Sequence, residues 1–199
     1  MSGSGKSHWS KRLAYEMGFQ NFYCDDLIEQ KLSKILPATI PAGIGRVAEW
    51  LGQPFEATFQ EREMQYLDCE IQVMQEVLSY LEMGQSKQVV IDTSGSVIYT
   101  GENICEALKS HSKVVYLRIS KNDEVKLLEQ FLRDPKPVLW NSLFAPLPGE
   151  SNKDAVSRCY PVLLEDRKKR YETMAHAVID VSMDDRAKLT TKDFISLLA

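Results

Sequence analysis

Met1-Ser2-Gly3-Ser4-Gly5-Lys6-Ser7 opens the chain and matches all but the first glycine of the phosphate-binding motif GxxxxGK[S/T]. That glycine would stand one residue before Met1. Glycines let successive backbone N–H groups turn toward phosphate oxygens, the lysine reaches the β- and γ-phosphates, and the hydroxyl after it can ligate magnesium. The motif predicts a nucleotide site; the alternative is a flexible start rich in glycine and serine. The predicted nucleotide-binding residues are Gly3, Ser4, Gly5, Lys6, Ser7 and His8.

The residues that follow the motif favour a helix. Trp9, Leu13 and Met17 recur at helical spacing, and Gly18 provides a stop. A phosphate loop should lead into such a helix, because the positive end of the helix dipole favours the anion. The pattern therefore supports the nucleotide site over the flexible start.

Length and composition favour one α/β domain over residues 1–199, with a formal net charge of −4. No basic run suggests a nucleic-acid partner, and no apolar run is long enough to span a membrane. The cysteines form no CxxC pair and predict reduced, structural thiols: Cys24, Cys69, Cys105 and Cys159. We expect a cytoplasmic protein that is a monomer or a weak dimer.

Strand-like and helical segments alternate, which is typical of a parallel sheet with helices on both faces. Strands are predicted at 21–24, 88–91, 113–119 and 176–181. Helical patterns occupy about 46–52, 55–83, 101–110, 121–133, 153–175 and 191–198. Residues 134–152 contain four prolines and predict a long mobile loop.

The strand that normally precedes a phosphate loop is not among these predicted strands. In mononucleotide kinases this strand lies at the centre of the sheet, and here it would lie upstream of Met1. We therefore expect that the first central strand is missing from the chain as given.

Asp92 follows the predicted strand 88–91, the position from which a carboxylate orients magnesium in nucleotide-binding proteins. Ser7 and Asp92 are therefore the predicted magnesium ligands. A turn-forming role of Asp92 before Thr93-Ser94-Gly95 is the alternative.

Several motifs give residues 1 to about 181 a resemblance to the shikimate kinase family of P-loop small-molecule kinases. Tyr23-Cys24-Asp25-Asp26-Leu27-Ile28-Glu29 is similar to the family's DxDxxIE motif. Asp25 and Ile28-Glu29 match, while Tyr23 replaces the first, magnesium-associated aspartate. Phe59-Gln60-Glu61-Arg62-Glu63 is similar to its FRxxE helix, with Gln60 in place of the carboxylate-binding arginine.

Three further landmarks carry the resemblance. Thr93-Ser94-Gly95 stands at the family's glycine triplet and keeps only the last glycine. Arg167 and Tyr171 match an arginine–tyrosine pair on the helix after the lid. Lys136-Pro137-Val138-Leu139 is similar to the lid stretch in which an arginine precedes Pro-Leu-Leu.

The resemblance implies a P-loop mononucleotide-kinase fold with a helical acceptor-binding region at about 33–83 and a lid at about 134–152. It implies in-line transfer of a phosphoryl group from ATP, with Mg²⁺, to a hydroxyl of a small metabolite. It implies that Arg133 reaches the nucleotide with the lid and that the adenine lies around 184–188. The implied catalytic residues are Lys6, Asp25 and Lys136, and the implied acceptor-binding residues are Asp25, Gln60, Ser94, Gly95 and Arg167.

Some of these assignments keep an alternative. Asp25 or Asp26 could cap a helix that begins at Leu27. Arg167 lies in a charged run that is otherwise typical of a solvated helix face. Trp140 either closes over a ligand or packs in a core.

The substitutions at Tyr23, Gln60 and Ser94 also leave other functions open. One is a nucleotide-binding degenerate kinase with a regulatory role, and another is a kinase of a different acceptor, such as a sugar acid or a nucleoside. A neutral amide does not replace the bidentate fork of an arginine, so we expect shikimate to be a poor substrate and Gln60→Arg to improve its use.

Overall fold

The computed structural model describes residues 4–84, 88–133, 136–182 and 189–198, with the backbone alone at 121–122. The helices and strands follow one another as α1 (Lys6–Met17), β1 (Gln20–Tyr23), α2 (Cys24–Leu32), α3 (Ile44–Leu51), α4 (Phe59–Glu82), β2 (Val89–Asp92), the 3₁₀ helix η1 (Val97–Tyr99), α5 (Glu102–His111), β3 (Val115–Ile119), α6 (Lys121–Arg133), α7 (Asn152–Met174), β4 (Ala177–Val181) and α8 (Thr191–Ser196). None of the helices in these ranges is long and apolar enough to cross a membrane.

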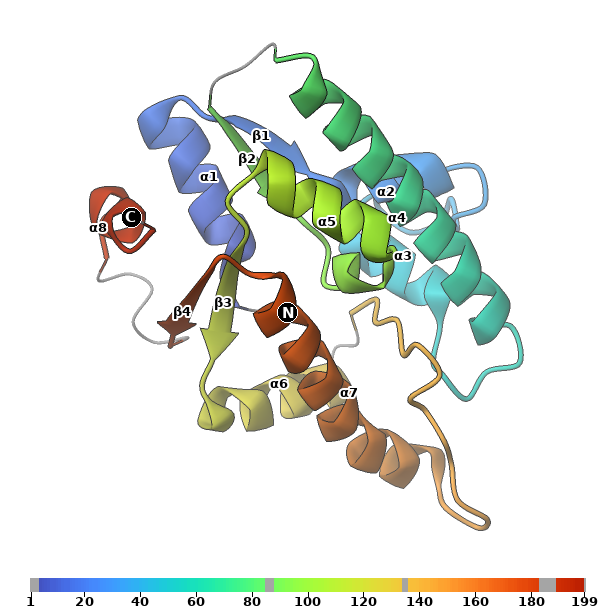
Figure 1. Ribbon diagram of the computed structural model, residues 1–199. Coiled ribbons are helices and arrows are strands. Elements are labelled where there is room, and N and C mark those ends of the chain that lie inside the picture. Colours follow the sequence, from blue (N-terminus) through green and yellow to red (C-terminus); the bar gives the residue numbers. More distant parts are fainter. Residues whose placement is uncertain (1–3, 85–87, 134–135, 183–188, 199) are drawn as a thin grey trace.

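The strands form two parallel pairs. β1 pairs with β2, with Phe22 opposite Ile91, and β3 pairs with β4, with Leu117 opposite Ile179. Within the described residues β2 and β3 are not hydrogen-bonded to each other. Helices α1 and α8 lie on one side of the strands, and α4, α5 and α7 lie on the other (Figure 1). The predicted α/β class with parallel strands and helices on both sides is confirmed.

The first helix ends as its sequence predicts. Gly18 adopts a φ of 72°, and its N–H donates to the carbonyls of Ala14 and Leu13. A residue with a side chain is strained in this left-handed conformation, so glycine suits the position. The indole ring of Trp9 stacks on the ring of Phe194 at 4.2 Å between centroids, which fixes α8 against α1.

The start of α2 differs from the expectation. Cys24 does not end β1 but begins α2, and Tyr23 occupies the N-cap position. Asp25 and Asp26 therefore lie in the first helical turn, where carboxylates favour the positive end of the helix dipole. The interpretation of either aspartate as the N-cap is wrong.

Trp140 belongs to a core. It is only 2% exposed, and its ring lies 5.4 Å from that of Phe144, 6.1 Å from that of Tyr160 and 6.2 Å from that of Phe131. Glu63 accepts hydrogen bonds from the backbone N–H groups of Trp140 and Asn141. Residues 138–140 are thus packed against α4, α6 and α7, and the alternative in which Trp140 is an exposed lid residue is wrong.

Candidate active site

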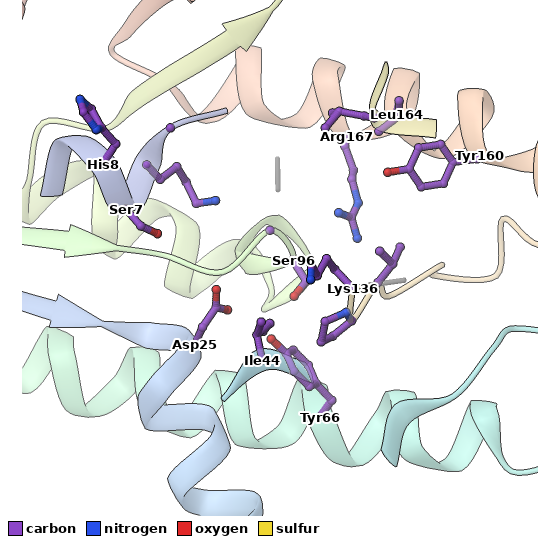
Figure 2. Close-up of a pocket in the computed structure, with 16 residues that line it drawn as sticks. Ser7, His8, Asp25, Ile44, Tyr66, Ser96, Lys136, Tyr160, Leu164 and Arg167 are labelled. Carbon is purple, nitrogen blue, oxygen red and sulfur yellow. The ribbon is translucent and has the colours of Figure 1, made fainter. Parts of the chain in front are cut away.

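A cavity of about 280 Å³ opens between the start of α1, the start of α2, the loop after β2 and helix α7 (Figure 2). Residues from these elements, from α3, α4 and α6 and from the segment after α6 meet in its wall. They are Gly5, Lys6, Ser7, His8, Asp25, Ile44, Tyr66, Gly95, Ser96, Leu127, Lys136, Pro137, Val138, Tyr160, Leu164 and Arg167.

The start of α1 forms the first end of the cavity. Gly5 is the N-cap with a φ of 98°, no side chain caps the helix, and its first turn contains no acidic residue. The N-terminus of a helix attracts anions through its N–H groups and its dipole, and Lys6 adds a positive charge there. This end therefore fits a phosphate group. Ser4, one residue before Gly5, is buried, and Gly3 lies outside the described residues.

Asp25 directs its carboxylate from the first turn of α2 into the cavity (Figure 2). Burial raises the pKa of Asp25, the nearby Lys6 opposes this effect, and Asp92 and Asp26 add to it. A carboxylate with a raised pKa is a stronger base toward a hydroxyl group than an exposed one. Asp25 thus has the position and the chemistry of a general base.

Arg167 enters the cavity from α7, on the side opposite Asp25 (Figure 2). Its side chain is 5% exposed, and one terminal N–H donates to the carbonyl of Leu139 at 2.8 Å. Its Nε has no hydrogen-bond partner among the described residues. A buried guanidinium with an unused donor fits an anionic group, because charge-assisted hydrogen bonds are the strongest kind.

Behind the end of the cavity where Arg167 lies is a buried carboxylate that was not predicted from the sequence. Glu70 is fully buried in α4 and accepts hydrogen bonds from the hydroxyls of Ser94 and Ser96. Burial raises the pKa of Glu70 to about 7, although both serines oppose the shift. The signal in the sequence was a glutamate on the apolar face of a helix that also carries Phe59 and Tyr66.

Asp92 and Ser94 lie beside the cavity and not in its wall. Asp92 is buried, and Ser10 Oγ lies 3.3 Å from both Asp92 Oδ2 and the carbonyl oxygen of Ser7. The side chain of Ser10 therefore links Asp92 to the start of α1. Ser94 is turned toward Glu70, whereas its neighbour Gly95 lines the cavity.

Two other predicted residues do not reach the cavity. Gln60 is exposed on α4 and points away, because it is rotated by about 100° from the buried Phe59. Arg133 is exposed at the end of α6 and pairs with Glu129 at 3.4 Å. The structure thus brings together Lys6, Asp25, Lys136 and Arg167 but neither Gln60 nor Arg133, and the segment expected near the adenine, 184–188, lies outside the described residues.

The oxygen atoms near the start of α1 suit magnesium. This ion takes one or two protein oxygens and completes its shell with phosphate oxygens and water, and Ser7 and Asp92 offer a hydroxyl and a carboxylate. Among the described residues, no group of three His, Cys, Asp or Glu side chains could hold a metal ion by itself. The residues therefore fit an ion that is bound together with a nucleotide.

Comparisons with known proteins bear on this arrangement. The sequence model of the family described as shikimate kinase matches residues 46–197. A solved structure, a shikimate kinase from Acinetobacter baumannii in complex with shikimate, is similar with a TM-score of 0.60 and 23% identity, over 98% of this chain and 83% of that chain. No curated protein sequence matches the chain. At this identity the structural likeness concerns the fold, and the family resemblance seen in the sequence is confirmed.

Proposed function

Because this chain belongs to the shikimate kinase family, we propose that it transfers the γ-phosphoryl group of ATP to a hydroxyl group of a small hydroxylated metabolite. One observation carries the proposal. A single cavity has an uncapped helix start with Lys6 at one end and the carboxylate of Asp25 opposite the guanidinium of Arg167 at the other. We further propose that the protein acts in the cytoplasm as a monomer or a weak dimer.

Transfer in this cavity requires positioning and charge neutralisation more than covalent chemistry. The start of α1 and Lys6 would hold the β- and γ-phosphates, and Ser7 with Asp92 would hold Mg²⁺, which neutralises phosphate charge when bound. Asp25 takes the proton of the acceptor hydroxyl as its oxygen bonds to the γ-phosphorus, and the bond from that phosphorus to the β-phosphate oxygen breaks to release ADP. Lys136 from the segment after α6 lines the same cavity and can stabilise the transferred charge.

Arg167 is the residue that would bind an anionic group of the acceptor. Gln60, at the position of the family's second carboxylate-binding arginine, is exposed and outside the cavity. We therefore expect shikimate to bind weakly, because only Arg167 would hold its carboxylate. A different hydroxylated compound, such as a sugar acid or a nucleoside, is the favoured acceptor.

The test is release of ADP from Mg·ATP with shikimate, gluconate and adenosine as acceptors, with the product identified by ³¹P NMR. We expect at least one acceptor to stimulate release. Asp25→Asn should lower the stimulated rate by about a hundredfold to ten-thousandfold, the range for loss of a general base. The exposed neighbour Asp26→Asn is the matched control. Binding of Mg·ATP in calorimetry without stimulation by any acceptor would contradict the proposal and favour a nucleotide-binding regulator.

A further inference from the structure

Glu70 is a fully buried carboxylate immediately behind the acceptor end of the cavity. No cation lies within ion-pairing distance of it in the described part of the chain, so its direct partners are the two serine hydroxyls, and Arg167 acts on it only from farther away. A buried charge without a cation costs stability, and an apolar residue would pack there at lower cost. The titratable and charged groups that face it from α2, α4, α5 and α7 are Cys24, Asp25, Tyr66, Cys105, Arg167 and Tyr171.

The hydrogen bonds to Glu70 fix where two hydroxyl protons point. Ser94 donates to one carboxylate oxygen, and Ser96 donates to the other at 2.6 Å. Each serine hydroxyl has one proton, so neither can donate elsewhere while it is bonded to Glu70. Ser96 lines the cavity, and its oxygen therefore offers only lone pairs to a molecule bound there.

The loop that carries these serines is held from two sides. Glu70 binds it from α4, and the hydroxyl of Tyr171 on α7 donates to the carbonyl of Gly95 at 2.6 Å. The N–H of Ser96 also donates to Ser94 Oγ at 3.1 Å. Both the backbone and the hydroxyl direction of the loop are thus defined.

We propose that Glu70 is a positioning residue for the acceptor: it holds Ser96 with its proton turned away, so that Ser96 accepts a hydrogen bond from a hydroxyl of the acceptor in the cavity that Asp25 faces. This inference rests on the proposed function and names a determinant of its specificity. The site selects an acceptor that donates a hydrogen bond at this point, because an analogue without that hydroxyl forgoes the hydrogen bond to the lone pair that Ser96 presents.

The protonation of Glu70 would reverse this arrangement. A neutral carboxyl group must donate its own proton to one of the serines, and that serine then turns its proton elsewhere. The KM for the acceptor should therefore rise as the pH falls through about 7, the pKa to which burial raises Glu70.

The kinetic test is a double-mutant cycle of Glu70→Gln and Ser96→Ala with shikimate, gluconate and adenosine as probes. Glu70→Gln keeps the shape but presents an N–H donor to one of the serines. We expect it to raise the acceptor KM about tenfold, which corresponds to the free energy of one hydrogen bond. The ATP KM should change less than about twofold, and the acceptor KM should no longer depend on pH. If Glu70 acts through Ser96, the double variant should be no worse than Ser96→Ala alone.

The matched control is Glu76→Gln on the exposed side of the same helix, where Glu76 pairs with Lys31 at 2.7 Å. It should leave both KM values as in the wild type. Equal acceptor KM values for wild type and Glu70→Gln, or additive effects in the double variant, would overturn the positioning role.

Infrared difference spectra between wild type and Glu70→Gln separate this inference from the proposed function, because they need no acceptor. We expect a band of a protonated carboxyl group that grows as the pH is lowered through about 7 and that shifts in Ser96→Ala. Absence of the band would overturn the assignment even in an active kinase. A band together with no turnover of any probe would overturn the proposed function and the acceptor role of Ser96, but not the hydrogen bonds of Glu70.

Discussion

The two ends of the cavity are built in different ways. The phosphate end consists of consecutive residues, from Gly5 to His8, at one helix start. The acceptor end brings together Asp25, Tyr66, Ser96 and Arg167 from distant parts of the chain. In the proposed reaction, backbone N–H groups and one lysine side chain would bind phosphate, whereas several side chains from different elements would bind the acceptor. The phosphate end can therefore stay the same among related proteins while the acceptor end differs. For this reason the type of reaction is easier to infer than the identity of the acceptor.

Loss of the positive charge at the phosphate end should have the largest effect. Lys6→Ala should lower the rate by about a hundredfold to a thousandfold and weaken Mg·ATP binding, because one preorganised charge at the transferred group is removed. Calorimetry and steady-state kinetics measure the two effects. Lys11→Ala, on the exposed side of the same helix, is the control and should behave as wild type. Equal ATP affinity of wild type and Lys6→Ala would show that the helix start does not bind phosphate.

The position of Arg167 at the acceptor end depends on the packing of residues 138–140, because Arg167 donates a hydrogen bond to the carbonyl of Leu139. Trp140→Ala should lower the free energy of unfolding by about 3–5 kcal/mol, because the buried indole contacts Phe131, Phe144 and Tyr160 and leaves a cavity when removed. Urea denaturation measures this loss. Leu147→Ala in the same segment is the control, since Leu147 is 57% exposed. A loss below about 1 kcal/mol for Trp140→Ala would mean that residues 138–140 are not packed in solution.

Glu70 should make the stability of the acceptor end depend on pH. Folding raises the pKa of Glu70 from 4.5 to about 7, so the folded state holds this proton more tightly than the unfolded chain. The resulting stabilisation is complete below pH 4.5 and is lost as the pH rises through about 7. At 1.36 kcal/mol per pKa unit, the change is about 3 kcal/mol.

Denaturation of wild type and Glu70→Gln at several pH values measures that change. The wild type should lose stability relative to the variant between pH 4.5 and about 7, whereas the exposed Glu76→Gln should follow the wild type throughout. Parallel curves for wild type and Glu70→Gln would show that Glu70 is not buried as described.

The features that the sequence predicted correctly are those set by neighbouring residues. The turn at Gly18 and the alternation of strands and helices follow from local backbone preferences and periodicity. The strand predicted at 88–91 is observed at Val89–Asp92, so only its ends moved. Family membership likewise followed from motifs that are short and contiguous.

The features that were missed depend on the packing between segments. Trp140 lies among prolines, and nothing in its sequence neighbourhood indicates that Phe131 and Tyr160, from two different helices, pack around it together with the nearby Phe144. The sequence shows Glu70 only as a charged residue on a helix. Its role becomes visible in the structure, where the hydroxyls of Ser94 and Ser96 donate hydrogen bonds to it. Gln60 aligns with a binding residue, but its direction is set by which face of α4 is buried.

Because Gln60 is exposed in the structure, Gln60→Arg should have the smallest effect on the KM for shikimate among the variants considered. The sequence alone favours improved use of shikimate by Gln60→Arg. In the structure, the face of α4 toward the cavity carries Tyr66, while Gln60 is exposed. An ion pair between solvent-exposed groups contributes at most about 1 kcal/mol to binding, and an exposed arginine that does not contact the ligand contributes less. We therefore expect the shikimate KM to change less than about twofold, as for the control Gln65→Arg on the exposed side of the same helix. An improvement of about tenfold in Gln60→Arg but not in Gln65→Arg would contradict this expectation and would mean that α4 moves toward the bound acceptor, so that the two ends of the cavity differ in rigidity as well as in construction.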